Sequence, residues 1–143
     1  MNKFSVDELN IFLKTLFPQA DNIGAVTGLA KNTAELKLIV NDSHLRPGGT
    51  ISGPTMMALA DVAMYAAILN AIGPVALAVT TNLNINFLRK PEADCDIVAA
   101  AKILKLGKRL AVGEVAIYSG PNTGADDNLV AHATITYSIP NHA

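Results

Sequence analysis

The sequence is poor in charge and contains no run of basic residues. Lysine and arginine number 11 against 12 acidic residues, which gives a formal net charge of −1. Binding to nucleic acid depends on clustered cations that contact phosphates, and a polybasic membrane-binding segment needs a similar cluster. We therefore expect no nucleic-acid partner and no membrane partner.

Cysteine is also scarce, because Cys95 is the only one. A single thiol excludes an intramolecular disulfide, a zinc site made of cysteines and a CxxC redox motif. The three histidines, His44, His132 and His142, do not show the spacing of a metal site. We predict that the protein needs no metal and no cofactor. The first ten residues lack the apolar core of a signal peptide, which favours a cytoplasmic location.

Apolar residues make up 50% of the 143 residues and charged residues only 16%. Domains most often have roughly 100–150 residues, so we expect residues 1–143 to form a single domain. A small domain with so little charge has more apolar surface than one core can bury. It then forms oligomers or binds an apolar ligand, and the two are compatible.

The most apolar segment extends from Pro54 to Ile72. Its length approaches the ~20 residues that cross a bilayer, but Asp61 in its middle would be costly in lipid. The segment is rich in Ala, Leu and Met, which favour helix, and it is apolar on nearly every side. We predict a buried helix with Gly53 as its N-cap and Pro54 as its first residue.

The other periodic segments predict a short helix and six strands. Ser5 and Glu8 form a capping-box pattern that opens a helix ending near Phe17. The strands are expected at residues 23–30, 33–40, 75–87, 97–106, 110–118 and 129–139. The last four strands have no helices between them, which favours an antiparallel meander. The expected fold class is α+β, a central apolar helix wrapped by a curved antiparallel sheet.

Asp61 is the main candidate for catalysis, since no Lys or Arg lies within one helical turn of it. Burial without a cationic partner raises the proton affinity of a carboxylic acid, which is how a general base is tuned. The alternative is structural: Asp61 accepts hydrogen bonds from backbone groups or bonds across a subunit interface. We take the functional role as the working hypothesis.

Gly53 is the second candidate. The unpaired N–H groups and partial positive charge of a helix N-terminus suit a thioester carbonyl or an oxyanion. Alternatively, Gly53 and Pro54 only start the helix. Eight residues at ~1.5 Å each place Asp61 ~12 Å along the helix from Gly53. If both serve one reaction, they come from different subunits.

Hydroxyl and basic side chains complete the candidate set. Thr80 and Thr81 can orient a water or a substrate carbonyl, although threonine is also simply a good strand former. Five cations in or near turns are suited to the phosphates of a nucleotide-bearing substrate, or they serve only solubility. They are Arg46, Arg89, Lys90, Lys108 and Arg109.

Two segments resemble the hotdog thioesterases of the phenylacetate-degradation, PaaI-like type. They are Gly49–Asp61 (GTISGPTMMALAD) and Ile85–Pro91 (INFLRKP), and the later segments GKRLAVGEV and VAHATITYS also match. The resemblance implies a hotdog fold and a homodimer, often paired into a homotetramer, with active sites between subunits. It further implies hydrolysis of an acyl-CoA, whose coenzyme A is part of the substrate.

The resemblance also implies roles for three residues. The carboxylate of Asp61 acts as general base or nucleophile on the thioester. The backbone N–H of Gly53, contributed across the interface, polarises the carbonyl, and Thr80 helps to place the water.

Three positions depart from the pattern. Ser52 replaces the family's histidine, Pro54 replaces its second glycine, and Arg46 stands where some members have an asparagine. We expect proline to leave the Gly53 N–H free and serine to remain a hydrogen-bond donor. The leading hypothesis is hydrolysis of a small or medium acyl-CoA, aryl or short-chain. The alternatives are a non-catalytic hotdog module that binds acyl-CoA as sensor or scaffold and, third, a hotdog hydratase or dehydratase.

Overall fold

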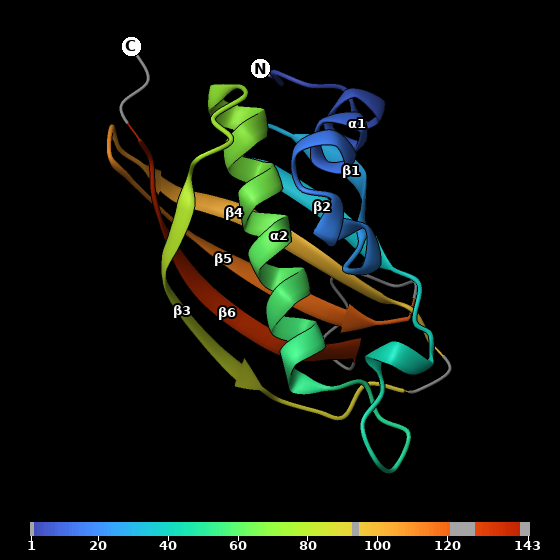
Figure 1. Ribbon diagram of the computed structural model, residues 1–143. Coiled ribbons are helices and arrows are strands. Elements are labelled where there is room, and N and C mark those ends of the chain that lie inside the picture. Colours follow the sequence, from blue (N-terminus) through green and yellow to red (C-terminus); the bar gives the residue numbers. More distant parts are fainter. Residues whose placement is uncertain (1, 93–94, 121–127, 141–143) are drawn as a thin grey trace.

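The computed structural model describes residues 2–92, 95–120 and 128–140. In these ranges a curved antiparallel sheet of six strands lies against the long helix α2 (Gly53–Ile72), and the short helix α1 (Val6–Leu16) covers one corner (Figure 1). The strands are β1 (Ala25–Ala30), β2 (Thr33–Leu38), β3 (Val79–Phe87), β4 (Ile97–Leu106), β5 (Leu110–Ser119) and β6 (Leu129–Ser138). Two short 3-10 helices are η1 (Pro18–Asn22) and η2 (Asp42–His44). The arrangement is the hotdog fold, so the predicted fold class is confirmed.

Helix α2 forms the centre of the hydrophobic core. By length and composition it could cross a membrane, but 67% of its most apolar window is buried inside the protein. Large side chains such as Leu59, Met64 and Ile68 have no exposed surface, because β2, β4 and β5 cover them. The predicted buried helix is therefore confirmed.

The start of α2 differs from the prediction by one residue. Ser52 is the N-cap, since its Oγ accepts the Thr55 N–H at 3.3 Å, and Gly53 is the first helical residue. The prediction of Gly53 as N-cap was wrong because a serine side chain can accept this hydrogen bond and a glycine cannot. The capping box of α1, formed by Ser5 and Glu8, is confirmed.

The strands follow the order β1-β2-β4-β5-β6-β3. The predicted meander holds for β4, β5 and β6, but β3 pairs with β6 and forms one edge of the sheet. Residues 88–92, which leave β3, do not form a tight turn; they pass below the start of α2 (Figure 1). The order predicted from sequence was wrong at this point, because the long connection from Phe87 to Ile97 reaches a strand that is not adjacent.

Three strand boundaries also differ by two residues or more, and hydrogen bonds explain them. The second strand was predicted to run to Val40 but ends at Leu38, because the Val40 N–H donates to the Asp96 side chain at 3.2 Å. The turn of η1 continues to Ile23, whose N–H donates to Ala20 O at 2.9 Å, so β1 begins only at Ala25. A second turn, in which the Ala78 N–H donates to Val75 O at 3.1 Å, delays the start of β3 to Val79.

Candidate active site

Asp61 lies in the middle of α2, on the wall of a cavity of about 280 Å³. Its Oδ1 accepts hydrogen bonds from Thr80 Oγ1 at 2.5 Å and from Tyr137 Oη at 2.8 Å. The Tyr137 hydroxyl also lies 3.0 Å from the Asp61 carbonyl oxygen. The structure thus brings Thr80 to Asp61 and adds a tyrosine beside them.

Tyr137 is held firmly in this position. Its ring stacks on Tyr65 with the centroids 6.1 Å apart, and the Tyr65 hydroxyl donates to Ala76 O at 2.8 Å. Burial raises the pKa of Tyr137, and the negative charge of Asp61 raises it further. The hydroxyl therefore stays protonated and acts as a donor.

Sequence reasoning did not identify Tyr137. The signal was present in the alternation along β6, which places Ala133, Ile135 and Tyr137 on the buried face. A tyrosine on a buried face needs a partner for its hydroxyl, and the partner here is the candidate catalytic carboxylate.

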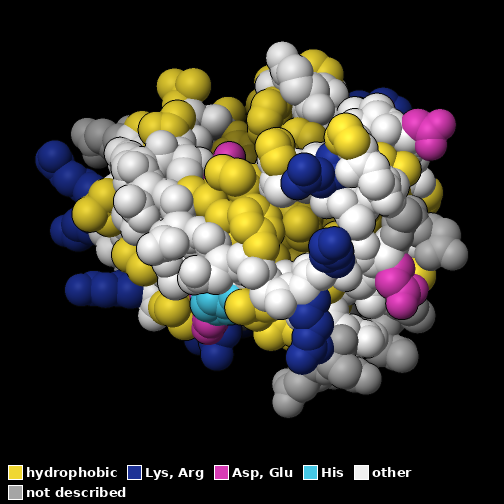
Figure 2. Space-filling view, turned by 90° about the horizontal axis from the view of Figure 1, so that it is seen from below, with side chains coloured by type: hydrophobic (Ala, Val, Ile, Leu, Met, Phe, Trp, Pro, Cys, Tyr) yellow, Lys and Arg dark blue, Asp and Glu magenta, His cyan; other side chains and the backbone are white. Residues whose placement is uncertain are grey.

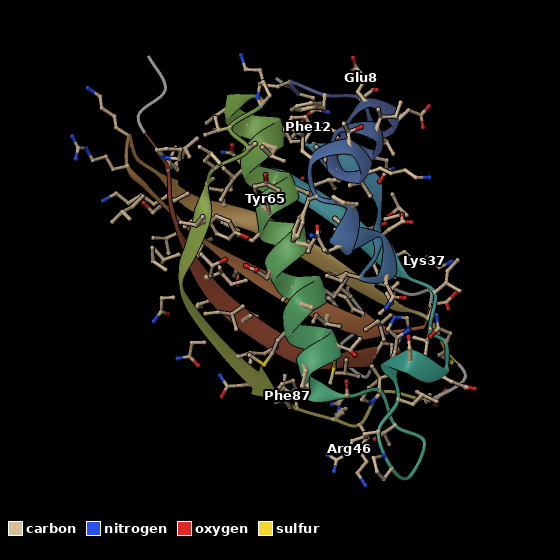
Figure 3. All side chains as sticks on the ribbon, in the orientation of Figure 1. Glu8, Phe12, Lys37, Arg46, Tyr65 and Phe87 are labelled. Carbon is tan, nitrogen blue, oxygen red and sulfur yellow. The ribbon has the colours of Figure 1, made fainter. Side chains whose placement is uncertain are left out.

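A second, larger cavity of about 740 Å³ lies at the start of α2. Figure 3 shows Arg46 and Phe87 at this end of the helix, whereas Tyr65 lies farther along it. Five residues predicted from sequence line this cavity, namely Arg46, Gly53, Pro54, Arg89 and Lys90. The structure thus gathers three of the predicted cations around the helix N-terminus.

The Gly53 N–H is the open donor at this end of α2. No hydrogen bond from it is found among the described residues, while the Thr55 N–H is bound by Ser52 and Pro54 has no N–H. The partial positive charge of the helix acts at the same point. The Phe87 ring packs on Gly53 so closely that an added Cβ would lie 3.3 Å from Phe87 Cζ.

Four predicted substrate-binding residues are placed elsewhere. Ser52 Oγ bonds Thr55 Oγ1 at 2.7 Å and caps the helix, and Thr81 Oγ1 donates to Thr136 O at 3.3 Å. Lys108 and Arg109 lie in the turn between β4 and β5, at the opposite end of the sheet from the loop before α2 (Figure 1). The structure does not bring these four residues into either cavity.

The two histidines that the structure describes also lie apart from Asp61. His44 is buried, with Nε2 2.8 Å from Asn22 O, and His132 Nε2 lies 2.9 Å from Glu114 Oε1 on the outer face of the sheet. His142 lies outside the described residues.

The two cavities are separate within one chain. No residue lines both of them, and ~12 Å of helix separates Gly53 from Asp61. Seen from the end where α2 begins, hydrophobic side chains gather in the middle of the face, with Lys and Arg side chains beside them (Figure 2).

Exposed apolar residues also gather on β3 and its flanks. Leu77 is 76% exposed and Val79 is 56% exposed, and Phe87, Leu88 and Met57 of α2 are exposed as well. β3 is an edge strand, paired on one side only. An unpaired edge strand with exposed apolar residues at both of its ends is characteristic of an interface.

The family model of the thioesterase superfamily matches residues 48–126, more than half of the chain. A solved structure of a Silicibacter sp. TM1040 protein assigned as a thioesterase is 46% identical, covers 98% of this chain and 94% of that chain, and has a TM-score of 0.86. A variant of the phenylacetic acid degradation protein PaaI from Thermus thermophilus is 27% identical, with coverages of 86% and 99% and a TM-score of 0.72. PaaI from the phenylacetic acid degradation operon of E. coli, 20% identical, shares the fold with a TM-score of 0.72 over 91% and 94% of the two chains. No curated protein sequence matches the chain.

The chain therefore belongs to the thioesterase superfamily. Proteins of the PaaI type are among its structural relatives, which confirms the resemblance stated from sequence. The predicted enzyme class, a hydrolase of thioester bonds, is confirmed by the same matches.

Proposed function

We propose that the protein hydrolyses a small or medium acyl-CoA, aryl or short-chain, to a free acid and CoA. The observation that carries the proposal is the difference between the linings of the two cavities. One holds a hydroxyl-bonded carboxylate among apolar and aromatic side chains, and the other holds a free backbone N–H among cations.

The cation-lined cavity suits the nucleotide part of the substrate. Arg46, Arg89 and Lys90 are suited to its phosphates, and the volume of about 740 Å³ lies in the usual range for ligand pockets. The cavity beside Asp61, at about 280 Å³ and lined by Phe17 and Tyr65 among others, suits a small acyl group. Roles for Lys108 and Arg109 stay predictions.

The chemistry requires one residue from each cavity. Asp61 takes a proton from a water that adds to the thioester carbonyl, or it attacks the carbonyl itself. The Gly53 N–H and the helix dipole stabilise the oxyanion that forms. When the C–S bond breaks on the general-base route, the CoA thiolate leaves and takes up the proton that Asp61 holds. On the nucleophilic route the thiolate leaves and takes a proton from solvent, and a water then hydrolyses the mixed anhydride formed with Asp61, which releases the free acid and restores the carboxylate. Thr80 donates its own hydrogen to Asp61, so its oxygen is left to accept a hydrogen bond from the water.

A second copy of the chain brings the two residues together. The unpaired edge of β3 and the exposed Met57, Val79 and Phe87 form a surface on which a copy related by two-fold symmetry can pack. Gly53 of one copy then faces Asp61 of the other. Pairing of such dimers into a homotetramer and a cytoplasmic location stay predictions, as does the absence of a cofactor.

Release of free thiol from a panel of acyl-CoAs tests the proposal, with the wild type compared with Asp61→Asn. The amide cannot act as base or nucleophile, so we expect the rate to fall about 10²–10⁴-fold. Circular dichroism checks that the variant is folded. A variant as active as the wild type would contradict the assignment of Asp61.

The non-catalytic alternative has one observation in its favour. Ser52, at the position of the family's histidine, is engaged with Thr55 and does not line the cavity. If no acyl-CoA is hydrolysed but acyl-CoA raises the melting temperature, the protein is a binding module.

A further inference from the structure

The two oxygens of the Asp61 carboxylate have different surroundings. Oδ1 accepts from both Thr80 Oγ1 and Tyr137 Oη. No hydrogen bond to Oδ2 is found in the part of the chain that the structure describes. Among the described residues, every buried side-chain nitrogen or oxygen has a hydrogen-bond partner. Because Oδ2 has none, it is not buried and solvent can reach it. One oxygen is thus fixed, and the other opens on the cavity.

We propose that Tyr137 is a positioning residue that, together with Thr80, holds Oδ1 of Asp61 and so makes Oδ2 the atom that works on the substrate. This inference rests on the proposed function and adds to it a residue and a choice of oxygen.

The arrangement constrains Asp61 from three elements. Asp61 comes from α2, Thr80 from β3 and Tyr137 from β6, and Thr80 and Tyr137 are directly paired across the two strands. The Tyr137 hydroxyl reaches both the side chain and the backbone carbonyl of Asp61. Stacking on Tyr65 fixes the ring. Two donors on one oxygen, one of which also contacts the backbone of Asp61, favour a single orientation of the carboxylate.

The two donors also act on the charge of the carboxylate. Thr80 and Tyr137 both donate to Oδ1, and hydrogen bonds to a charged acceptor are stronger than those between neutral groups. Among the described residues that line the cavity, Tyr65 and Tyr137 are the other titratable groups, and none is a cation. The hydroxyl donors therefore replace the cationic partner that Asp61 lacks.

Tyr137→Phe is the primary test, because it removes the hydroxyl and keeps the ring. We expect kcat to fall about 10–100-fold, the value of a hydrogen bond to a charged group. KM should change less than about threefold, since the cations lie in the other cavity. The acid limb of the pH–rate profile should move to higher pH, because the carboxylate loses a donor.

Two further variants separate positioning from packing. Tyr65→Phe removes a hydroxyl from the same cavity, but that hydroxyl donates to Ala76 O, so the acid limb should stay in place. Replacing Tyr137 with difluorotyrosine keeps the ring and the hydroxyl. This variant tests the inference if Tyr137→Phe does not fold. A more acidic hydroxyl is a stronger donor, so the acid limb should move to lower pH.

A readout independent of turnover is the carbon-13 NMR titration of the aspartate carboxyl groups, in which Asp61→Asn identifies the signal of residue 61. In Tyr137→Phe this signal should titrate at higher pH. If Asp61→Asn is inactive while Tyr137→Phe keeps the wild-type kcat and titration, the inference is overturned and the proposed function stands. Equal loss of rate at every pH with an unchanged titration means a packing role only and also overturns it. If Asp61→Asn is active, both fall.

Discussion

The two cavities along α2 differ in every property that matters for a ligand. The one at Gly53 is large, lined by Arg46, Arg89 and Lys90, and has an open backbone donor. The one at Asp61 is small, has no cation among the described residues that line it, and contains a carboxylate whose partners are hydroxyl groups. The first lining suits a charged molecule and the second an uncharged group. On the proposed function each cavity supplies one half of the site, and the comparison teaches that the two halves are too far apart to meet within one chain.

The largest effect should come from Gly53→Pro compared with Gly53→Ala. Both variants add a Cβ against Phe87, but only proline removes the N–H, and proline is well tolerated at the first helical position. Ser52 has the extended conformation that a following proline requires. We expect kcat to fall about 10²–10³-fold in the proline variant, as for other lost oxyanion donors, and only severalfold in the alanine variant. Equal rates of thiol release in the two variants would exclude the Gly53 N–H as donor.

The next prediction tests whether one active site takes Asp61 from one chain and Gly53 from another. Asp61→Asn and Gly53→Pro are each expected to retain at most about 1% of the wild-type rate alone. In a mixed dimer, one site receives the intact Asp61 from one copy and the intact Gly53 from the other. Refolding an equal mixture should therefore restore about a quarter of the wild-type activity, because about half of randomly formed dimers are mixed and each has one intact site. No recovery in dimers shown to be mixed by mass spectrometry would mean that one chain supplies both residues.

The smallest effect should separate binding from chemistry. Arg46→Ala removes one cation from the Gly53 cavity, and we expect KM for acyl-CoA to rise about tenfold with kcat little changed. The same variant should hydrolyse an acyl-pantetheine, which lacks the nucleotide phosphates, with the wild-type KM. Lys14→Ala, at the end of α1, is the matched control for loss of a surface charge. An equal increase in KM for both substrates would show that Arg46 shapes the cavity and does not contact phosphate.

Much of the fold could be predicted from the sequence because its signals are local. The capping box of Ser5 and Glu8 and the apolar character of α2 each depend on neighbouring residues. The position of β3 could not be predicted in this way, since pairing with β6 depends on contacts between residues about fifty apart in sequence. The N-cap was missed because serine and glycine both satisfy the pattern at residues 52 and 53.

The residues of the candidate site likewise divide into those that could be predicted from the sequence and those that could not. Asp61 and Gly53 stood out from sequence because each is unusual where it lies, a carboxylate inside an apolar helix and a glycine before a proline. Tyr137 did not stand out, because a tyrosine in a strand is ordinary until its hydroxyl is found on Asp61. Arg46 and Lys90 lie far apart in the sequence. They line the same cavity only because the segment after β3 passes below the start of α2.

The unpaired edge of β3 also affects a newly folded chain that has not yet assembled. A newly folded copy presents a row of free backbone N–H and C=O groups beside exposed Leu77 and Val79, and such an edge joins any compatible strand that it meets. If copies assemble through this edge as proposed, folding and assembly are coupled, so that dilution should lower the thermal midpoint and crowding of unassembled chains should lead to aggregates. The alternating asparagines Asn82, Asn84 and Asn86, all exposed, reduce this hazard by keeping one face of the strand polar.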